Sequence, residues 1–258
     1  GLLYSDEIPR QMVNENIPLS SGVYALLNMK SPLLADATLR QALQRGTDTA
    51  ELRKSVGLLD FALVLPYIPQ HIQTIAAPQK TTANVAQAAA MLDNAGWKLN
   101  GAYRSKGDVK LKLRVAAVKD TRYTAVIDEL TRQWKKLGVE VEPLVFDPQA
   151  TQQSFAQVVL QPRAYDVLVN ELLIGGDGDV FAYWHSTQAQ AAGYNFSNYQ
   201  NGLVDDTLSS ARTTSDPTVR SRKYAVFGEQ WLKDVPAIGL FQSALRYAHT
   251  KTAVGVDT

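Results

Sequence analysis

The sequence predicts an α/β fold, and three consecutive segments support this prediction. Residues 109–115 alternate Val and Leu with Lys and Arg, which is the period-two pattern of a strand with one solvated face. Residues 123–137 repeat apolar side chains at helical spacing and are followed by Gly138, a typical helix terminator. Residues 139–142 alternate Val with Glu and predict a second strand. A strand, a helix and a strand in this order form a right-handed parallel crossover, the unit of an α/β sheet.

The other elements are placed by turn residues and helix caps. Three more strands are expected where short apolar runs are bounded by turn residues: residues 22–29, 165–173 and 236–242. Asp36 is a suitable N-cap for a helix over residues 37–45, and Asp216 followed by Pro217 begins a long helix near the end of the chain. Residues 58–69 are apolar but interrupted by proline, so we expect an ordered loop packed on the core.

Composition excludes several classes of function. The chain has 258 residues, of which 45% are hydrophobic, and its 26 basic and 25 acidic side chains give a net charge of +1. Such a chain can build a globular core, and its mixed charges leave no basic stripe for nucleic acid. Cysteine is absent, which excludes disulfides, thiolate nucleophiles and cysteine-based metal sites. No apolar run reaches the ~20 residues of a membrane-spanning helix.

The motifs of common enzymes are also missing. The three histidines, His71, His185 and His249, are far apart, and neither a zinc-protease motif nor a serine-hydrolase motif occurs. Residues 175–179 form a glycine-rich acidic turn, but Phe181 replaces the last glycine of a dinucleotide fingerprint, and the aspartates would repel pyrophosphate. We therefore expect a protein that is not an enzyme, with no catalytic residue, no cofactor and no metal. A hydrolase with dispersed catalytic residues stays open as an alternative.

Several short segments occur in the order found in one protein family. Residues 37–43, ATLRQAL, are similar to a helix that reads VRQAL, and residues 90–97, AMLDNAGW, are similar to a helix end that reads LLxxAGW. Residues 130–139, LTRQWKKLGV, are similar to the helix-to-strand step IQxQLKxIGI. Further similar segments are residues 22–28, 165–166, 177–186, 193–199 and 236–240. Together they resemble the C-terminal half of the family 5 extracellular solute-binding proteins, the oligopeptide, dipeptide and nickel-binding class of ABC importers.

This resemblance implies a fold and a domain organisation. The fold would be a lobe of the periplasmic-binding-protein type II kind, with a mixed sheet flanked by helices. Residues 1–21 would form a hinge or linker from an N-terminal lobe, residues 22–245 the ligand-binding lobe, and residues 246–258 a return segment. Because the sequence shows no initiator Met and no signal peptide, we expect that it is cut from a longer protein.

The resemblance also implies a function. The protein would be the monomeric capture component of an ABC importer, closing two lobes on a peptide or another small cationic or polar solute. It would work in the periplasm or lipid-anchored at the outer face of the membrane, and its partner would be an ABC permease. One departure bears on specificity: many peptide-binding members carry Trp-x-x-Asp-Tyr where residues 172–178 read LLIGGDG. The usual peptide specificity is therefore not carried over.

The ligand-binding residues are expected at the carboxyl end of the strand that begins near Tyr165, because ligands of open α/β sheets meet the carboxyl ends of strands. The candidates are Asn170, Glu171, Leu172, Asp177 and Asp179, with Tyr24, Asn28 and Asn195 as additional ones. The three acidic candidates could accept a cationic group of the solute, or they could form a solvated acidic turn. A ligand-sensing domain of a transcription regulator, which can use the same lobe fold, is the other alternative function.

Overall fold

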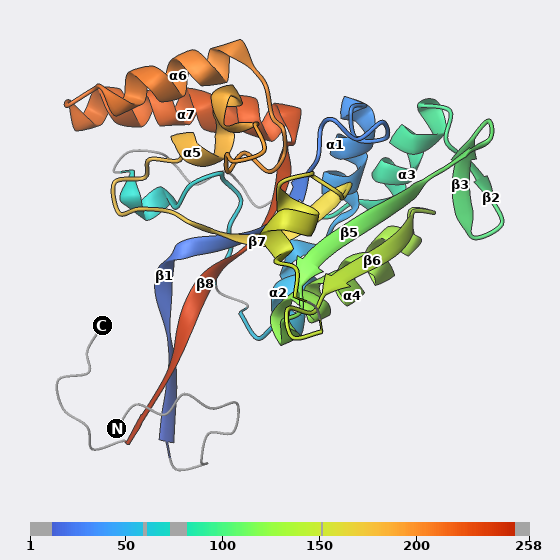
Figure 1. Cartoon of the computed structure of the whole chain (residues 1–258), viewed down its shortest axis with the longest axis horizontal. Helices are drawn as coiled ribbons and strands as arrows, with labels where there is room; N and C mark the ends of the chain where they lie inside the picture. The colour runs from blue at the N-terminus through green and yellow to red at the C-terminus, as the bar shows by residue number, and fades with distance from the viewer. Residues whose placement is uncertain (1–11, 59–60, 73–81, 151, 251–258) are drawn as a thin grey trace.

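A five-stranded mixed sheet organises the chain, seen here in a computed structural model that describes residues 12–58, 61–72, 82–150 and 152–250. The strand order is β6-β5-β7-β1-β8 (Figure 1). The strands are β1 (Met12–Leu27), β5 (Lys112–Val118), β6 (Glu140–Phe146), β7 (Val167–Leu173) and β8 (Ala237–Thr250). Strand β5 is parallel to both β6 and β7, whereas β1 is antiparallel to its neighbours β7 and β8. The expected parallel crossover and the mixed sheet are confirmed.

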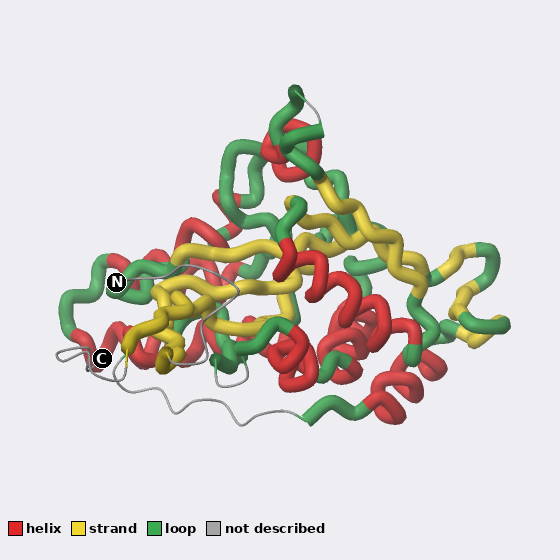
Figure 2. The backbone as a smooth tube through the Cα atoms, turned by 90° about the horizontal axis from the view of Figure 1, so that it is seen from below, coloured by secondary structure: helices red, strands yellow, loops and turns green. Residues whose placement is uncertain are grey.

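Helices cover both faces of this sheet (Figure 2). One group packs with the core that contains Val23, Ala25 and Leu27 of β1, and it consists of α1 (Ala37–Gly46), α2 (Thr49–Ser55), α3 (Val85–Asn94) and α4 (Thr121–Lys135). The other group packs with Tyr24 and Leu26, and it consists of α5 (Phe181–Trp184), α6 (Gly202–Arg212) and α7 (Pro217–Asp234). Because successive side chains of a strand point to opposite faces, β1 supplies both cores. Short helical turns lie at Pro69–His71, Ala156–Leu160 and Ser186–Gln188.

The expected helix starts are confirmed in atomic detail. The Asp36 carboxylate accepts a hydrogen bond from the backbone N–H of Thr38 at 2.8 Å and so caps α1. The Asp216 carboxylate accepts from two backbone N–H groups of the first turn of α7, and Pro217 occupies the first helical position, where no N–H is needed. Both signals are local, which is why the sequence reveals them.

The expected single strand over residues 109–115 is wrong in one respect, because it is divided between two sheets. Val109 and Lys110 form β4, which joins β2 (Lys98–Asn100) and β3 (Tyr103–Lys106) in a three-stranded sheet of order β2-β3-β4. At the division, the backbone N–H of Leu111 donates to the carbonyl of Arg104, and Val109 is 54% exposed. The period-two pattern continues through this change of partner, so periodicity alone cannot detect it.

Strands β1 and β8 continue beyond the sheet as a two-stranded ribbon, in which Met12 pairs with Thr250 and Pro18 with Ala244 (Figure 1). We call residues 12–18 and 244–250 the ribbon. The ladder is irregular between Pro18 and Gly22, where the expected boundary of the lobe also lies. Proline has no N–H to donate, so an interruption of the ladder at this position has a physical cause.

The loop over residues 61–68 packs on the sheet, as expected for residues 58–69. Buried side chains from this loop join the same core as α6 and α7. The close approach requires glycine beneath it: a Cβ built on Gly22 would lie 2.3 Å from a side-chain carbon of Leu63, and one on Gly239 would lie 2.4 Å from the Leu63 carbonyl oxygen. In the described parts of the chain, no helix combines the length and apolar character that crossing a membrane requires.

Replacing Gly239 by alanine tests this close approach. The new methyl group would meet backbone rather than a mobile side chain, because its nearest neighbour is the Leu63 carbonyl oxygen at 2.4 Å. We expect Gly239→Ala to lower the free energy of unfolding by about 1–3 kcal/mol, measured by urea denaturation. Gly202→Ala is the matched control, because nothing lies within 4 Å of its added Cβ. Equal stability of the two variants would show that the loop does not pack as described.

Candidate ligand-binding edge

The carboxyl ends of three parallel strands meet at one edge of the main sheet. Val115 of β5 is level with Val167 of β7, and Val118 at the end of β5 is level with Phe146 at the end of β6. The end of β7 reaches the same edge, where Leu173 pairs with Ser21 of β1. The ribbon leaves the sheet at this edge. We call this side of the sheet the carboxyl edge, because it is where ligands of open α/β sheets are usually bound.

Glu171 is the acidic side chain that β7 itself places near this edge. The Ser21 hydroxyl of the neighbouring strand donates to Glu171 Oε1 at 2.6 Å. Tyr123, in the first turn of α4, lies close enough to be affected by the carboxylate: burial mainly, and the Glu171 charge in addition, raise the pKa of Tyr123 to about 12. Within the described ranges, Glu171 forms no ion pair with a lysine, arginine or histidine. Its negative charge therefore lacks a partner of opposite sign there.

The two other acidic candidates follow in the turn after β7, and both have arginine partners. Asp179 lies 2.8 Å from Nε of Arg212 at the end of α6, and its other oxygen accepts from the backbone N–H of Phe181 at 3.0 Å. Asp177 lies 3.6 Å from the guanidinium of Arg220 in α7, and its side chain is 63% exposed. A cationic solute would have to compete with these arginines. The turn is thus held to α6 by a short ion pair and to α7 by a longer, more exposed one.

Asn170 and Leu172 differ in their access to the carboxyl edge. The Asn170 side chain is half-buried and donates to the carbonyl oxygen of Glu171 at 2.9 Å. Leu172 is buried in the core below α6 and α7. The side chain after it, Leu173, is 73% exposed, although it ends an apolar strand. The alternation of a strand explains this arrangement, since neighbours point to opposite faces.

Tyr24, Asn28 and Asn195 are placed inside the protein, with internal partners for their polar groups. The Tyr24 hydroxyl donates to the Leu65 carbonyl at 2.9 Å, and the ring packs against two buried tryptophans. The Asn28 amide donates to the Tyr165 carbonyl at 2.9 Å, near the start of β7 and so at the opposite end of the sheet. Asn195 is fully buried and its amide donates to the carbonyls of His185 and Tyr199. The structure does not bring these three side chains to the carboxyl edge.

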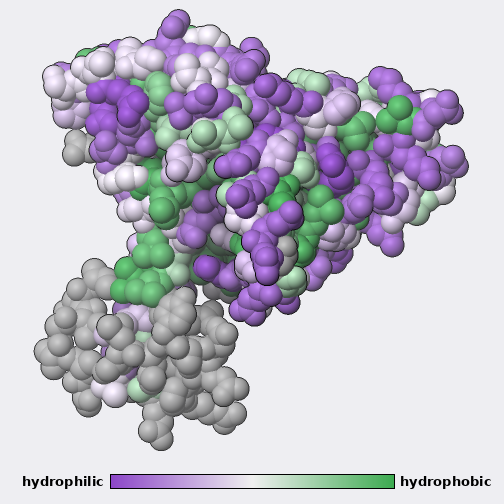
Figure 3. Space-filling view, in the orientation of Figure 1, coloured by the Kyte–Doolittle hydropathy of each residue, from purple (hydrophilic) through white to green (hydrophobic). Residues whose placement is uncertain are grey.

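Several residues at this edge were not anticipated from the sequence. Ser21 and Tyr123 come from a different strand and from a helix, and only the strand register and the packing of α4 bring them to Glu171. Lys119 and Asp147, which follow β5 and β6, form an ion pair at 2.6 Å. A lysine after one strand and an aspartate after the next are the only sequence signal for this pair. Figure 3 shows a hydrophobic surface at the neck, where the ribbon meets the body and where Leu19 is exposed.

These observations can be set beside known proteins. The sequence model of the bacterial extracellular solute-binding proteins, family 5 Middle, matches residues 4–199. The chain belongs to this family. The resemblance drawn from the short sequence segments is thereby confirmed. Family members are substrate-binding proteins, which are not enzymes, and the family is an extracellular one.

Solved structures of this family share the fold. The oligopeptide-binding protein AppA of Bacillus subtilis, in complex with a nonapeptide, is 23% identical with a TM-score of 0.80, covering 96% of this chain and 50% of that chain. NikZ of Campylobacter jejuni, in complex with Ni(L-His), is 21% identical with a TM-score of 0.77, covering 94% and 49%. DppA of Helicobacter pylori, in complex with the peptide STSA, is 18% identical with a TM-score of 0.76, covering 94% and 45%. The chain thus spans about half the length of these proteins. No curated protein matches it.

The two ion pairs of the turn after β7 are expected to contribute differently to the free energy of unfolding. Asp179→Asn should lower the free energy of unfolding by about 1–2 kcal/mol, because this carboxylate forms an ion pair with Arg212 and also accepts a hydrogen bond from the Phe181 N–H. Asp177→Asn removes the same charge but should cost less than about 0.5 kcal/mol, because its pair is long and exposed. Urea denaturation at low and at high salt is the measurement. A larger effect of Asp177→Asn would contradict this description of the turn.

Proposed function

We propose that this chain is the C-terminal lobe of the substrate-capture component of an ABC importer. Residues 22–245 would form the lobe, and residues 1–21 and 246–258 would connect it to a second lobe. The observation that carries the proposal is the coincidence of the ribbon with the carboxyl edge: two strands leave the sheet side by side at the place where its strand ends are open. A double connection beside a binding edge is suited to a hinge between lobes that close on a solute.

The carboxyl edge offers one wall of a site. Leu173 is 73% exposed there and Glu171 is partly exposed, so both can meet a solute that approaches along the end of β7. Small-molecule sites bury most of the surface of their ligand, which a single wall cannot do. A second lobe would supply the opposite wall, and the solute would stabilise the closed form by its greater affinity for it.

The solute we propose is a peptide or another small cationic or polar compound. Of the acidic candidates, Glu171 is the one without an arginine partner among the described residues. A carboxylate that closure removes from water needs a cationic partner, which would favour the closed form. The AppA and DppA structures named above contain peptides, which is compatible with this class. In this proposal the protein acts as a monomer outside the membrane and delivers the solute to an ABC permease.

Comparing the chain with the longer protein tests the capture function. The two-lobed protein, purified and analysed by mass spectrometry after denaturation, should release a bound solute. That solute should bind the 258-residue chain at least about 100-fold more weakly than the two-lobed protein in calorimetry, because half of its contacts are missing. Equal affinity for the two proteins would contradict two-lobe closure.

A charge-neutral substitution at Glu171 tests the proposed wall. In the two-lobed protein, Glu171→Gln should weaken the binding of a cationic solute by about 2–5 kcal/mol, because the cation would be buried without a partner. The binding of a neutral analogue should change much less. Glu142→Gln is the matched control, because this exposed carboxylate of β6 pairs with Lys112, near the amino-terminal ends of the parallel strands. Calorimetry with the four combinations gives the answer. An equal loss of affinity for both solutes would mean that Glu171 does not contact the cation and only accepts the hydrogen bond from Ser21.

A further inference from the structure

The small sheet β2-β3-β4 carries a local excess of positive charge. Residues 98–112 contain five basic side chains and a single acidic one, Asp108, whereas the whole chain has 26 basic and 25 acidic side chains. This sheet projects at the end of the molecule that lies away from the ribbon and from α6 and α7 (Figure 1). Strand β4 leads into the start of β5, so the small sheet lies at the end of the main sheet opposite the carboxyl edge.

Two of the five basic side chains are paired within the protein. Arg104 is buried, and its guanidinium lies 2.5 Å from the Asp93 carboxylate. Lys112, at the start of β5, forms ion pairs with Glu140 and Glu142 of the neighbouring strand. These two cations therefore serve the fold and leave three others on the small sheet.

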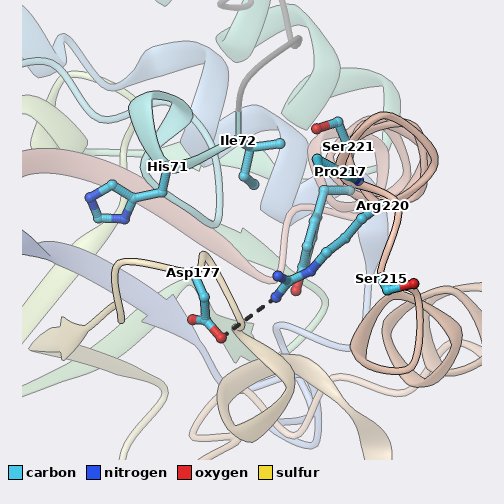
Figure 4. A pocket seen from close by; sticks show the side chains of 8 residues that line it. His71, Ile72, Asp177, Ser215, Pro217, Arg220 and Ser221 are labelled. Carbon is cyan, nitrogen blue, oxygen red and sulfur yellow. Dashed lines mark ion pairs between the residues drawn. The ribbon is translucent and has the colours of Figure 1, made fainter.

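The remaining three, Lys98, Lys106 and Lys110, are exposed and form no ion pair with any residue that the structure describes. The Lys98 ammonium group donates to a backbone carbonyl at 3.3 Å. The turn after β7 differs in this respect, because Arg220 there has Asp177 opposite it in the pocket that Figure 4 shows. The small sheet thus offers positive charge that the described part of the protein does not neutralise.

Two further lysines, Lys135 and Lys136 at the end of α4, lie next to this sheet. A Cβ built on Gly138 would be 2.8 Å from a side-chain carbon of Leu99, and the Gly138 N–H donates to the Lys135 carbonyl. Both lysines are exposed and have no ion-pair partner in the described ranges. We call the following residues the lysine patch: Lys98, Lys106, Lys110, Lys135 and Lys136, together with Leu99 and Val109.

The two aliphatic side chains of the lysine patch are exposed although they lie in strands. Leu99 of β2 is 59% exposed and Val109 of β4 is 54% exposed. The strand register places Leu99 opposite Arg104 and Val109 opposite Lys106, so both aliphatic side chains are on the same face of the sheet. Transfer of such side chains from water into an apolar phase is favourable.

The composition of the lysine patch favours a lipid surface over a protein partner. The central parts of protein interfaces are rich in Tyr, Trp and Arg and poor in Lys, whereas lysine dominates here and Arg104 is buried. A lysine ammonium group is a hydrated point charge on a flexible stem, which suits phosphate groups that move in the plane of a bilayer. Exposed aliphatic side chains beside such charges can enter the boundary between lipid headgroups and acyl chains.

We propose that the lysine patch contacts an anionic membrane surface. The lipid phosphates would neutralise the lysines, and Leu99 and Val109 would enter the boundary between headgroups and acyl chains. The family is an extracellular one, so the surface would be the outer face of the cell membrane. Each lysine adds a modest attraction, so the contact would be reversible. Because the patch lies opposite the carboxyl edge, the contact leaves that edge open and does not depend on which solute is captured.

Sedimentation with lipid vesicles tests the contact. The 258-residue chain should bind vesicles of phosphatidylglycerol and phosphatidylcholine in equal parts at least about tenfold more tightly than vesicles of phosphatidylcholine alone. Binding should weaken as salt is added, because salt screens the attraction between lysines and lipid phosphates. If the chain does not bind the phosphatidylglycerol vesicles at low salt, the proposal is wrong.

A triple variant locates the contact on the small sheet. Replacing Lys98, Lys106 and Lys110 by glutamine should weaken binding to the phosphatidylglycerol vesicles at least about tenfold, because three attractive charges are lost. All three side chains are exposed, so the variant should keep the free energy of unfolding of the parent chain in urea denaturation.

The matched control removes the same net charge elsewhere. Lys30, Lys223 and Lys233 also form no ion pair among the described residues, and they lie after β1 and in α7. Their replacement by glutamine should change vesicle binding by less than about twofold, because they lie outside the lysine patch. Equal losses in the two triple variants would show a general effect of net charge and would overturn the proposal.

Val109→Thr tests the entry of the aliphatic side chains, because threonine has nearly the same shape but is polar. It should weaken vesicle binding by about threefold. Val219→Thr is the control, because Val219 is 41% exposed in α7, outside the lysine patch. Unchanged vesicle binding of Val109→Thr would overturn the entry of these side chains into the bilayer.

Polyglutamate distinguishes a membrane from an acidic protein, because it carries negative charge without lipid. If polyglutamate binds with the same dependence on the three lysines while the phosphatidylglycerol vesicles do not bind, the partner is an acidic protein and the membrane proposal is wrong. Such a result would leave the capture function standing, because that proposal rests on the carboxyl edge and the ribbon.

Discussion

The antiparallel pairing of β1 with two strands at once is the constraint on which the rest of the structure depends. On one side β1 pairs with β7 from Ser21 to Leu27, and on the other side it pairs with β8 along most of its length. Its side chains supply both cores in alternation. Since β5 and β6 are parallel to β7, fixing β1 against β7 also fixes where all the carboxyl ends lie. The ribbon and the open edge therefore cannot be separated without breaking the central pairing.

The opposite end of the sheet is closed by a network of buried amides. The Asn28 amide donates to the Tyr165 carbonyl, and its oxygen accepts from the Asn198 amide at 2.8 Å. Asp166 at the same end accepts from the Ser31 hydroxyl at 2.7 Å and from the backbone of Arg114. A buried polar network whose members are all paired rigidifies its surroundings and offers nothing to a ligand. Glu171, which forms no ion pair among the described residues, lies on the side where the ribbon leaves.

The sequence predicts those features of the fold that depend on neighbouring residues. Asp36 and Asp216 act within their own first helical turn, so the caps can be placed without any knowledge of tertiary structure. The division of the strand at Leu111 depends on a bond to Arg104, and the extension of β1 to Met12 depends on β8 at the other end of the chain. Neither partner is visible in the local pattern. The same distinction applies to the site, where Glu171 was anticipated from its position at a strand end, whereas Ser21, Tyr123 and Arg220 come from distant segments.

The pairing of β1 with β8 is irregular between Pro18 and Gly22, so the ribbon can bend there relative to the sheet. Neighbouring segments hold this stretch by hydrogen bonds: the Gln242 side chain donates to the Leu19 carbonyl at 2.9 Å, the Ile174 N–H donates to the Ser20 carbonyl at 2.7 Å, and the Ser21 hydroxyl donates to Glu171. The ladder between β1 and β8 is interrupted here and again between Val23 and Tyr24, so bending of the ribbon relative to the sheet would be concentrated at these positions. The bond from Ile174 joins this point directly to the segment between β7 and the acidic turn. A bend at this stretch would therefore also displace the turn after β7, which Arg212 and Arg220 hold by ion pairs.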